Sequence, residues 1–171
     1  MDASTSEVVQ VPTVEDDITV RRLRTAFGDA VLSASDFRGQ LAVSVDPGRI
    51  VDVCTFLKTD RELQFQQLLD ITAVDYLNRA PRFDVVYSLL SMSRKARLRL
   101  KAPVDGGDPR IASVSGLWHA ANFAEREVFD LFGIRFDGHP DLRRILLPDH
   151  WEGHPLRHDH PVGGEEVGFT S

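Results

Sequence analysis

The spacing of apolar residues along the chain predicts three helices. Apolar positions recur with helical spacing in residues 18–27, in the segment after Asp46-Pro47, and in residues 117–132. Gly28 is placed to end the first helix, and Asp46-Pro47 supplies a capping acceptor and a preset first residue for the second. Cys54 lies on the apolar face of that second helix, so we expect it to pack in the core rather than act as a reactive thiol.

Strand-like spacing predicts five strands, in residues 30–33, 41–45, 67–77, 82–92 and 96–104. Turn-rich segments separate the last three, so an antiparallel meander is the simplest connection between them. The segment 83–90 is apolar on both alternating faces, which is typical of a central strand covered on each side. The predicted fold class is therefore α+β, with a mixed, largely antiparallel sheet and helices packed on it.

The strand at 96–104 has one basic face, because Arg97, Arg99 and Lys101 alternate with apolar residues. Such charges commonly protect an exposed edge strand from aggregation, and we take this as the first interpretation. The alternative is a docking face for an acidic partner.

The helix predicted at 117–132 carries more apolar surface than one packing partner requires. On a helical wheel its polar side chains gather in one narrow wedge, and apolar residues fill most of the remaining circumference. We therefore expect the helix to be buried in its own domain or sandwiched between that domain and another protein. The wedge contains His119, Asn122, Arg126 and Asp130.

Glu125 and Glu127 fall on opposite flanks of the apolar arc, since two residues correspond to about 200° of helical rotation. They cannot serve together as a general acid and base. A carboxylate in such surroundings needs a cation or hydrogen-bond donors, so we expect structural ion pairs rather than catalysis or simple exposure to solvent. The candidate cations are Arg126, Arg135, Arg143 and Arg144.

Helical and strand periodicity disappears after the predicted helix. Residues 133–171 contain recurring prolines and two Gly-His-Pro triplets, yet also many large apolar side chains. We therefore predict a C-terminal arm (residues 133–171) extended along a partner, with its arginines as bidentate contacts. The expected organisation is an acidic flexible N-terminus at 1–17, an α+β domain at 18–132, and this arm.

Composition narrows the function classes. The net charge of −6 disfavours a nucleic-acid-binding protein, and one cysteine excludes an internal disulfide and a self-contained iron–sulfur cluster. The first residues are acidic and lack Arg and Lys, so we expect no targeting segment, and no apolar run is long enough to span a membrane. These features predict a cytoplasmic protein that enters no bilayer alone.

Five histidines in the arm suggest zinc as an alternative, and a zinc-dependent hydrolase is the runner-up function. The spacing is poor for it, because Gly153 and Pro155 break the helix that would align the ligands. We expect turn and interface roles instead. The histidines are His139, His150, His154, His158 and His160.

Three motifs resemble a known family. Residues 125–134 read EREVFDLFGI, residues 138–146 read GHPDLRRIL, and residues 151–157 read WEGHPLR. This resembles the signature of the hydrophilic 30 kDa subunit of NADH:quinone oxidoreductase (complex I), a family with counterparts in photosynthetic NDH complexes and in energy-converting hydrogenases. The resemblance covers about residues 66–161. His158 and His160 depart from it, since relatives usually have Lys and Tyr there.

The resemblance implies a structural subunit without a catalytic, cofactor or metal site, bound to the quinone-site subunit and to neighbouring peripheral-arm subunits. FMN, iron–sulfur clusters and quinone are then expected in partner subunits, and the chain is expected at the cytoplasmic side of the cell membrane, peripherally and only through the complex. The residues expected to bind partners are Glu125, Arg126, Glu127, Asp130, His139, Arg143, Arg144, Trp151, His154 and Arg157.

Overall fold

The computed structural model describes residues 13–161, which form a five-stranded sheet, a two-stranded sheet and three α-helices. The helices are α1 (Ile18–Phe27), α2 (Ile50–Thr59) and α3 (Ala121–Phe132). The strands are β1 (Val31–Phe37), β2 (Gln40–Val45), β3 (Gln67–Asp75), β4 (Phe83–Ser91), β5 (Ala96–Val104), β6 (Arg110–Ala112) and β7 (Arg135–Asp137). Short 3₁₀ helices occupy Val14–Asp16, Gly28–Ala30 and Pro47–Arg49.

The start of the described chain is more ordered than predicted. Of the expected flexible segment 1–17, residues 1–12 lie outside the described part, but Val14–Asp16 forms a 3₁₀ turn. The N–H and hydroxyl of Thr13 both donate to the Asp16 carboxylate, at 2.9 and 2.8 Å. The Asp17 side chain then accepts from the N–H of Thr19 and caps α1, so the predicted bounds of that helix are confirmed.

The larger sheet has the strand order β1-β2-β5-β4-β3. The β3–β4–β5 meander is antiparallel as predicted, and β1 and β2 form a hairpin. The hairpin joins the meander through parallel pairing of β2 with β5, so the sheet is mixed and largely antiparallel. This pairing corrects the first interpretation of the basic strand, because β5 lies at the centre of the sheet and not at its edge.

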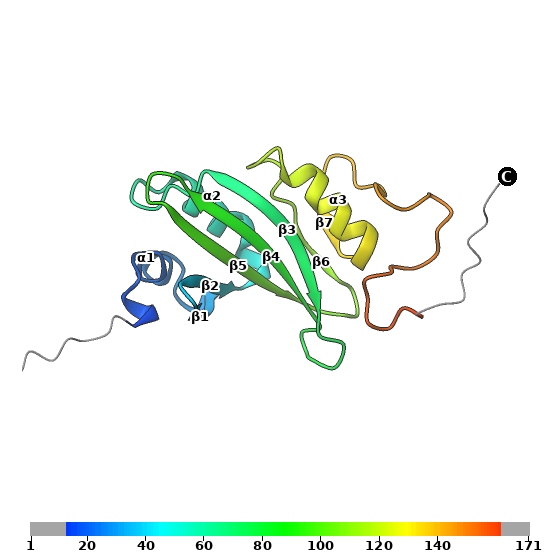
Figure 1. Ribbon diagram of the computed structural model, residues 1–171, viewed down its shortest axis with the longest axis horizontal. Coiled ribbons are helices and arrows are strands. Elements are labelled where there is room, and N and C mark those ends of the chain that lie inside the picture. The colour runs from blue at the N-terminus through cyan, green and yellow to red at the C-terminus, as the bar shows by residue number, and fades with distance from the viewer. Residues whose placement is uncertain (1–12, 162–171) are drawn as a thin grey trace, which may run out of the picture.

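The core lies on one face of this sheet. Ile50, Val53, Cys54 and Leu57 of α2 are all 0% exposed and belong to one buried cluster with Val20 and Leu23 of α1 and the inward-facing strand residues. Figure 1 shows α2 behind β3, β4 and β5. Burial raises the pKa of the Cys54 thiol, which agrees with packing rather than reactivity.

The helix predicted at 117–132 begins four residues later, at Ala121. Residues 115–120 form two tight turns, with the N–H groups of Leu117 and Trp118 donating to the carbonyl of Val114. Trp118 is held there because it is 6% exposed and its indole N–H donates to the Gln66 carbonyl at 2.9 Å. These tertiary contacts override the helical spacing of the sequence.

The arm also begins with a strand that its composition did not predict. β7 pairs in parallel with β6, and Ile111 and Phe136 of the pair are buried. Irregular structure therefore starts at Gly138. Within residues 13–161, no helix is long and apolar enough to cross a membrane.

Candidate partner-binding surface

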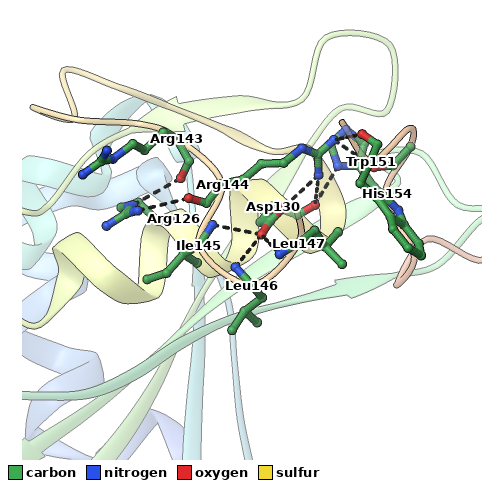
Figure 2. Close-up of polar contacts among 10 residues, drawn as sticks. Arg126, Asp130, Arg143, Arg144, Ile145, Leu146, Leu147, Trp151 and His154 are labelled. Atoms are coloured by element: carbon green, nitrogen blue, oxygen red, sulfur yellow. Dashed lines mark hydrogen bonds and ion pairs between the residues drawn. The ribbon is translucent and has the colours of Figure 1, made fainter. Parts of the chain in front are cut away.

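Asp130 organises the contact between α3 and the arm. It lies in the last turn of α3 and is 0% exposed, although a carboxylate near a helix C-terminus is electrostatically unfavourable. Its Oδ2 accepts the backbone N–H groups of Ile145, Leu146 and Leu147 at 3.0, 2.8 and 2.9 Å. Its Oδ1 accepts from Arg144 Nη1 at 2.7 Å (Figure 2).

These donors keep Asp130 ionised in a buried place. Burial alone would raise the pKa of this carboxyl, but the N–H of Leu147, Arg144 and the N–H groups of Leu146 and Ile145 outweigh burial and lower it. A carboxylate with this many donors fixes the path of the chain at 144–147. Asp130 is thus a structural anion that shapes the arm.

Arg144 extends the same network along the arm. Its side chain is 18% exposed, and Nη2 donates to the carbonyls of Trp151 and Gly153 at 3.1 and 3.2 Å. The Arg144 side chain therefore links Asp130 of α3 to the segment 151–153 of the arm. Trp151 itself is half-buried, and its indole N–H has no acceptor among the described residues.

Arg126 and His139 hold the first part of the arm to the same side of α3. Arg126 lies one turn before Asp130, and its Nε and Nη2 donate to the carbonyls of Arg143 and Arg144 at 3.2 and 3.1 Å. The Nδ1 of His139 accepts the N–H of Asp141, so its Nε2 carries the proton and donates to the Asn122 carbonyl at 3.0 Å. The predicted polar wedge is therefore the face on which the arm lies.

The second half of the arm caps the C-terminus of α3, whose last carbonyls lack partners within the helix. His154 Nδ1 donates to the Asp130 carbonyl at 2.9 Å, and Arg157 Nε donates to the Phe132 carbonyl at 2.6 Å. The N–H of Leu156 donates to the Leu131 carbonyl at 3.1 Å. Burial lowers the pKa of both His154 and Arg157.

Gly133 is required at the end of α3 for two reasons. Its φ of +70° is in the left-handed region, where a side chain is strained. A Cβ there would also collide with His154 Nε2 and would come within 2.7 Å of Arg157 Nη2. The absent side chain leaves the space that the arm's capping residues occupy.

The end of the described arm is tied to the β3–β4 hairpin. Asp75 is 4% exposed and accepts two hydrogen bonds from Arg82, at 2.8 and 2.6 Å, and one from the N–H of His158 at 2.9 Å. Arg82 also binds Asp159 at 2.7 Å. These contacts hold the pKa of Asp75 well below its usual range, and the hydrogen bonds from Arg82 have the largest effect. Sequence reasoning missed Asp75 and Arg82, although both flank the turn-rich segment between β3 and β4.

Glu125 lies on the other side of α3 and corrects the expectation of an ion pair. It is 0% exposed, and its carboxylate accepts the Ser113 hydroxyl at 2.6 Å and the Val114 N–H at 2.7 Å, with no arginine in contact among residues 13–161. Burial raises its pKa to about 7, although both donors lower it. Ser113 was not foreseen, because only the tight turns before α3 bring it there.

Two of the predicted partner-binding residues project into solvent. Glu127 is exposed, and the Arg143 side chain is 71% exposed, with an ion pair to Asp141 at 2.9 Å. Figure 2 shows the Arg143 side chain pointing away from Asp130. Seven of the predicted residues are instead buried or partly buried and bind other groups of this chain through their side-chain polar atoms: Glu125, Arg126, Asp130, His139, Arg144, His154 and Arg157.

The arm's outward surface carries large apolar side chains among its exposed charged residues. Figure 2 shows Ile145 and Leu146 directing their N–H groups toward Asp130 and their side chains away from it. Leu146 is 60% exposed and Ile145 38%, while Leu156 further along the arm is 51% exposed and Phe123 on α3 63%. The hydrogen bonds that turn the backbone N–H groups inward therefore leave these apolar side chains on the outside.

The histidines do not gather into a metal site. In the described part of the chain, no group of three or more His, Cys, Asp or Glu side chains could hold a metal ion. His139 and His154 bind backbone carbonyls, and His150 is exposed. The zinc-hydrolase alternative thus has no support.

Comparison with known proteins gives a consistent family. The sequence pattern of one protein family, the respiratory-chain NADH dehydrogenase 30 kDa subunit, matches residues 43–166. An NADH-quinone oxidoreductase subunit from Roseiflexus sp. (strain RS-1) is 55% identical over 156 residues, which cover 91% of this chain and 90% of that one. The equivalent NADH-quinone oxidoreductase subunit from Geobacter sulfurreducens is 48% identical over 153 residues, covering 89% and 93%.

Two solved structures share the fold. A trypsin-resistant fragment of Nqo5 has a TM-score of 0.63 and 38% identity, covering 71% of this chain and 97% of the fragment. A chain of the membrane-bound sulfane sulfur reductase, an archaeal respiratory membrane complex, has a TM-score of 0.70 and 25% identity, covering 83% of each. On this evidence the chain belongs to the family of the respiratory-chain NADH dehydrogenase 30 kDa subunit, whose members include subunits of NADH-quinone oxidoreductase.

Proposed function

We propose that this chain is a structural subunit of the peripheral arm of NADH:quinone oxidoreductase and docks on the quinone-site subunit through α3 and the arm. In this role it has no catalytic site of its own, and FMN, iron–sulfur clusters and quinone are bound by other subunits. It is held at the cytoplasmic side of the cell membrane only through the complex. Family membership supports the assembly, and the surface geometry supports the docking mode.

The supporting observation is that polar groups of the arm bind α3 on the inward side, while large apolar side chains of the arm are left exposed on the outward side. The network around Asp130 fixes the backbone at 145–147, so Leu146 is presented without further ordering. Preorganised apolar side chains bind at lower entropic cost than those of a flexible tail. We therefore assign the partner contact mainly to Leu146, Ile145, Leu156 and the exposed Arg143, and assign Arg144 to positioning.

Leu146→Asp tests this assignment. The substitution buries a charge at the proposed interface, so we expect about tenfold less of this chain in the purified complex, with a corresponding fall in membrane NADH:quinone activity. The matched control is Leu32→Asp, because Leu32 is 52% exposed but lies on β1, away from the arm. Equal incorporation of both folded variants would contradict the docking surface.

A photo-crosslinking residue in place of Leu146 tests the identity of the partner. In the assembled complex we expect the main product to join this chain to the quinone-site subunit. A product that joins it only to other subunits would refute that assignment while leaving the surface in place. Arg143→Glu should weaken incorporation with little effect on folding, since that side chain is 71% exposed.

A further inference from the structure

The sheet has a second face, which no described helix covers. Alternate residues of a strand point to opposite faces, and Leu98, Leu100 and Ala102 of β5 point into the core. Arg97, Arg99 and Lys101 therefore point outward from the central strand of the sheet. Arg97 and Arg99 are exposed, and Lys101 is partly exposed.

The three cations have no anionic partner among residues 13–161. None of them makes a hydrogen bond or ion pair there, whereas arginines elsewhere, such as Arg82 and Arg144, bind carboxylates. Their cross-strand neighbours are uncharged: Ala42 and Ser88 flank Arg99, and Ser44 and Val86 flank Lys101. Like charges at alternate strand positions, about 7 Å apart, repel one another, and within residues 13–161 no ion pair offsets this cost, although the Asp70 carboxylate lies on the same face.

The surface around the row is hollowed rather than flat. A hollow of about 260 Å³ is lined by Asp70, Ser88, Arg97 and Arg99, together with Gln40 and apolar groups. A second hollow of about 520 Å³ is lined by Gly39, Leu90, Met92, Lys95 and Arg97. Arg97 belongs to both, and Met92 is 65% exposed. The face thus combines a basic row with an apolar end.

We propose that this outer sheet face binds an acidic segment of a partner protein, with carboxylates on Arg97, Arg99 and Lys101 and an apolar side chain in the hollow at Met92. The proposal rests on the chain being a subunit, and it adds a surface separate from the arm. Charge complementarity is the argument for this partner. The chain has a net charge of −6, so a basic row without ion pairs at the centre of the sheet is a local exception that an acidic partner would complement.

A partner protein fits better than this chain's own acidic residues near its end. Glu165 and Glu166 come soon after His158 and Asp159, which are tied to Asp75 and Arg82. Arg82 precedes the first residue of β4, which pairs with the last residue of β5, at the far end of that strand from Arg97. An anionic membrane surface fits less well too, because an apolar hollow at one end of a basic row suits a peptide with both carboxylates and an apolar side chain.

Zero-length carbodiimide coupling in the purified complex tests the proposal, because it joins a lysine to a carboxylate already in contact with it. We expect Lys101 to be linked to an Asp or Glu of another subunit, as identified by mass spectrometry. Lys101→Arg keeps the charge and should abolish that product. Arg97→Glu with Arg99→Glu should lower it about tenfold, whereas Arg61→Glu with Arg135→Glu, an equal charge change at exposed sites elsewhere, should not.

Several outcomes would overturn the proposal. Links from Lys101 only to Glu165 or Glu166 would assign the face to this chain's own end, and the absence of any Lys101 link in a complex containing the chain would leave it without an acidic partner. Binding of the full chain to phosphatidylglycerol vesicles that is lost with Arg97→Glu and Arg99→Glu would assign it to lipid. Failure of the chain to enter the complex at all would instead refute the proposed function.

Discussion

Glu125 and Asp130 lie little more than one turn apart on α3, and both are 0% exposed, yet their surroundings differ in kind. Asp130 faces the arm and has an arginine and three N–H donors, so its pKa is lowered. Glu125 faces the core and has one hydroxyl and one N–H, so burial raises its pKa to about 7.

This difference shows that burial alone does not set the charge of a carboxyl group. Without a cation, two neutral donors leave desolvation dominant, and the neutral acid is favoured. Nearby Tyr87 is also fully buried, and its hydroxyl has no partner among the described residues. The core side of α3 therefore favours neutral groups, while the arm side depends on a permanent charge.

Removing the charge of Asp130 should have the largest effect. Asp130→Asn leaves Arg144 without its carboxylate, and breaking a buried ion pair costs about 3–5 kcal/mol. The arm should then open more often, and trypsin should cut after Arg143, Arg144 and Arg157 roughly 100- to 3,000-fold faster, because cleavage follows the open population.

Glu127→Gln is the control for that experiment, since it removes one negative charge from a more exposed position on the same helix. Its cleavage rate should match that of the unaltered chain. Similar rates for the Asp130→Asn and Glu127→Gln variants would mean that the Asp130 network does not hold the arm.

Glu125→Gln should have an effect of about 3 kcal/mol that depends on pH. The folded-state pKa of about 7 lies above the ordinary value of 4.5, so the folded chain binds the proton more tightly. The stability contributed by Glu125 is therefore complete below about pH 4.5 and is lost as the pH rises to about 7.

Urea unfolding from about pH 4.5 to about pH 8 measures this effect as the difference between the two chains. The unaltered chain should lose stability relative to the Glu125→Gln variant across that range, and the difference should become constant once the pH is well above the folded-state pKa. Contributions from Asp75 and Asp130 cancel in the comparison. A difference that stays constant with pH would show that folding does not shift the pKa of Glu125.

Gly133→Ala should have the smallest effect, about 1–2 kcal/mol, and it leaves both carboxyl groups unchanged. Gly138→Ala is a matched control, because its φ of +83° imposes the same backbone strain with no atom within 4 Å of the added Cβ. Trypsin cleavage of the arm should be faster in the Gly133→Ala variant. Equal rates would mean that His154 and Arg157 move aside freely.

The sequence predicted local elements better than long-range pairing. The bounds of α1 matched, and the strands of the meander fell within two residues of their predicted ends, because periodicity and turn residues report local geometry. The pairing of Leu41 with Leu98 leaves no periodic signal, so β5 was placed at an edge. Residues 117–120 looked helical, but Trp118 is held by Gln66 from a distant turn.

For the site, the sequence identified the polar wedge and the arm but not how they meet. Spacing showed that Arg126 and Asp130 share a face of α3, yet the backbone N–H groups of residues 145–147 carry no side-chain signature. Residue type alone could not predict that Arg144 and His154 bind α3 of this chain rather than a partner. The partner-binding assignments of Arg143, Glu127 and Trp151 stay predictions.

The parallel pairing of β2 with β5 also constrains the order in which the chain folds. The β3–β4–β5 meander joins neighbours in sequence, so it can form early, whereas β2 must wait for a strand that is made much later. During synthesis the β1–β2 hairpin therefore exposes Val43 and Val45 until residues 96–104 have left the ribosome. A pause in translation between residues 45 and 104 would prolong the interval in which this hairpin is open to chaperones or to aggregation.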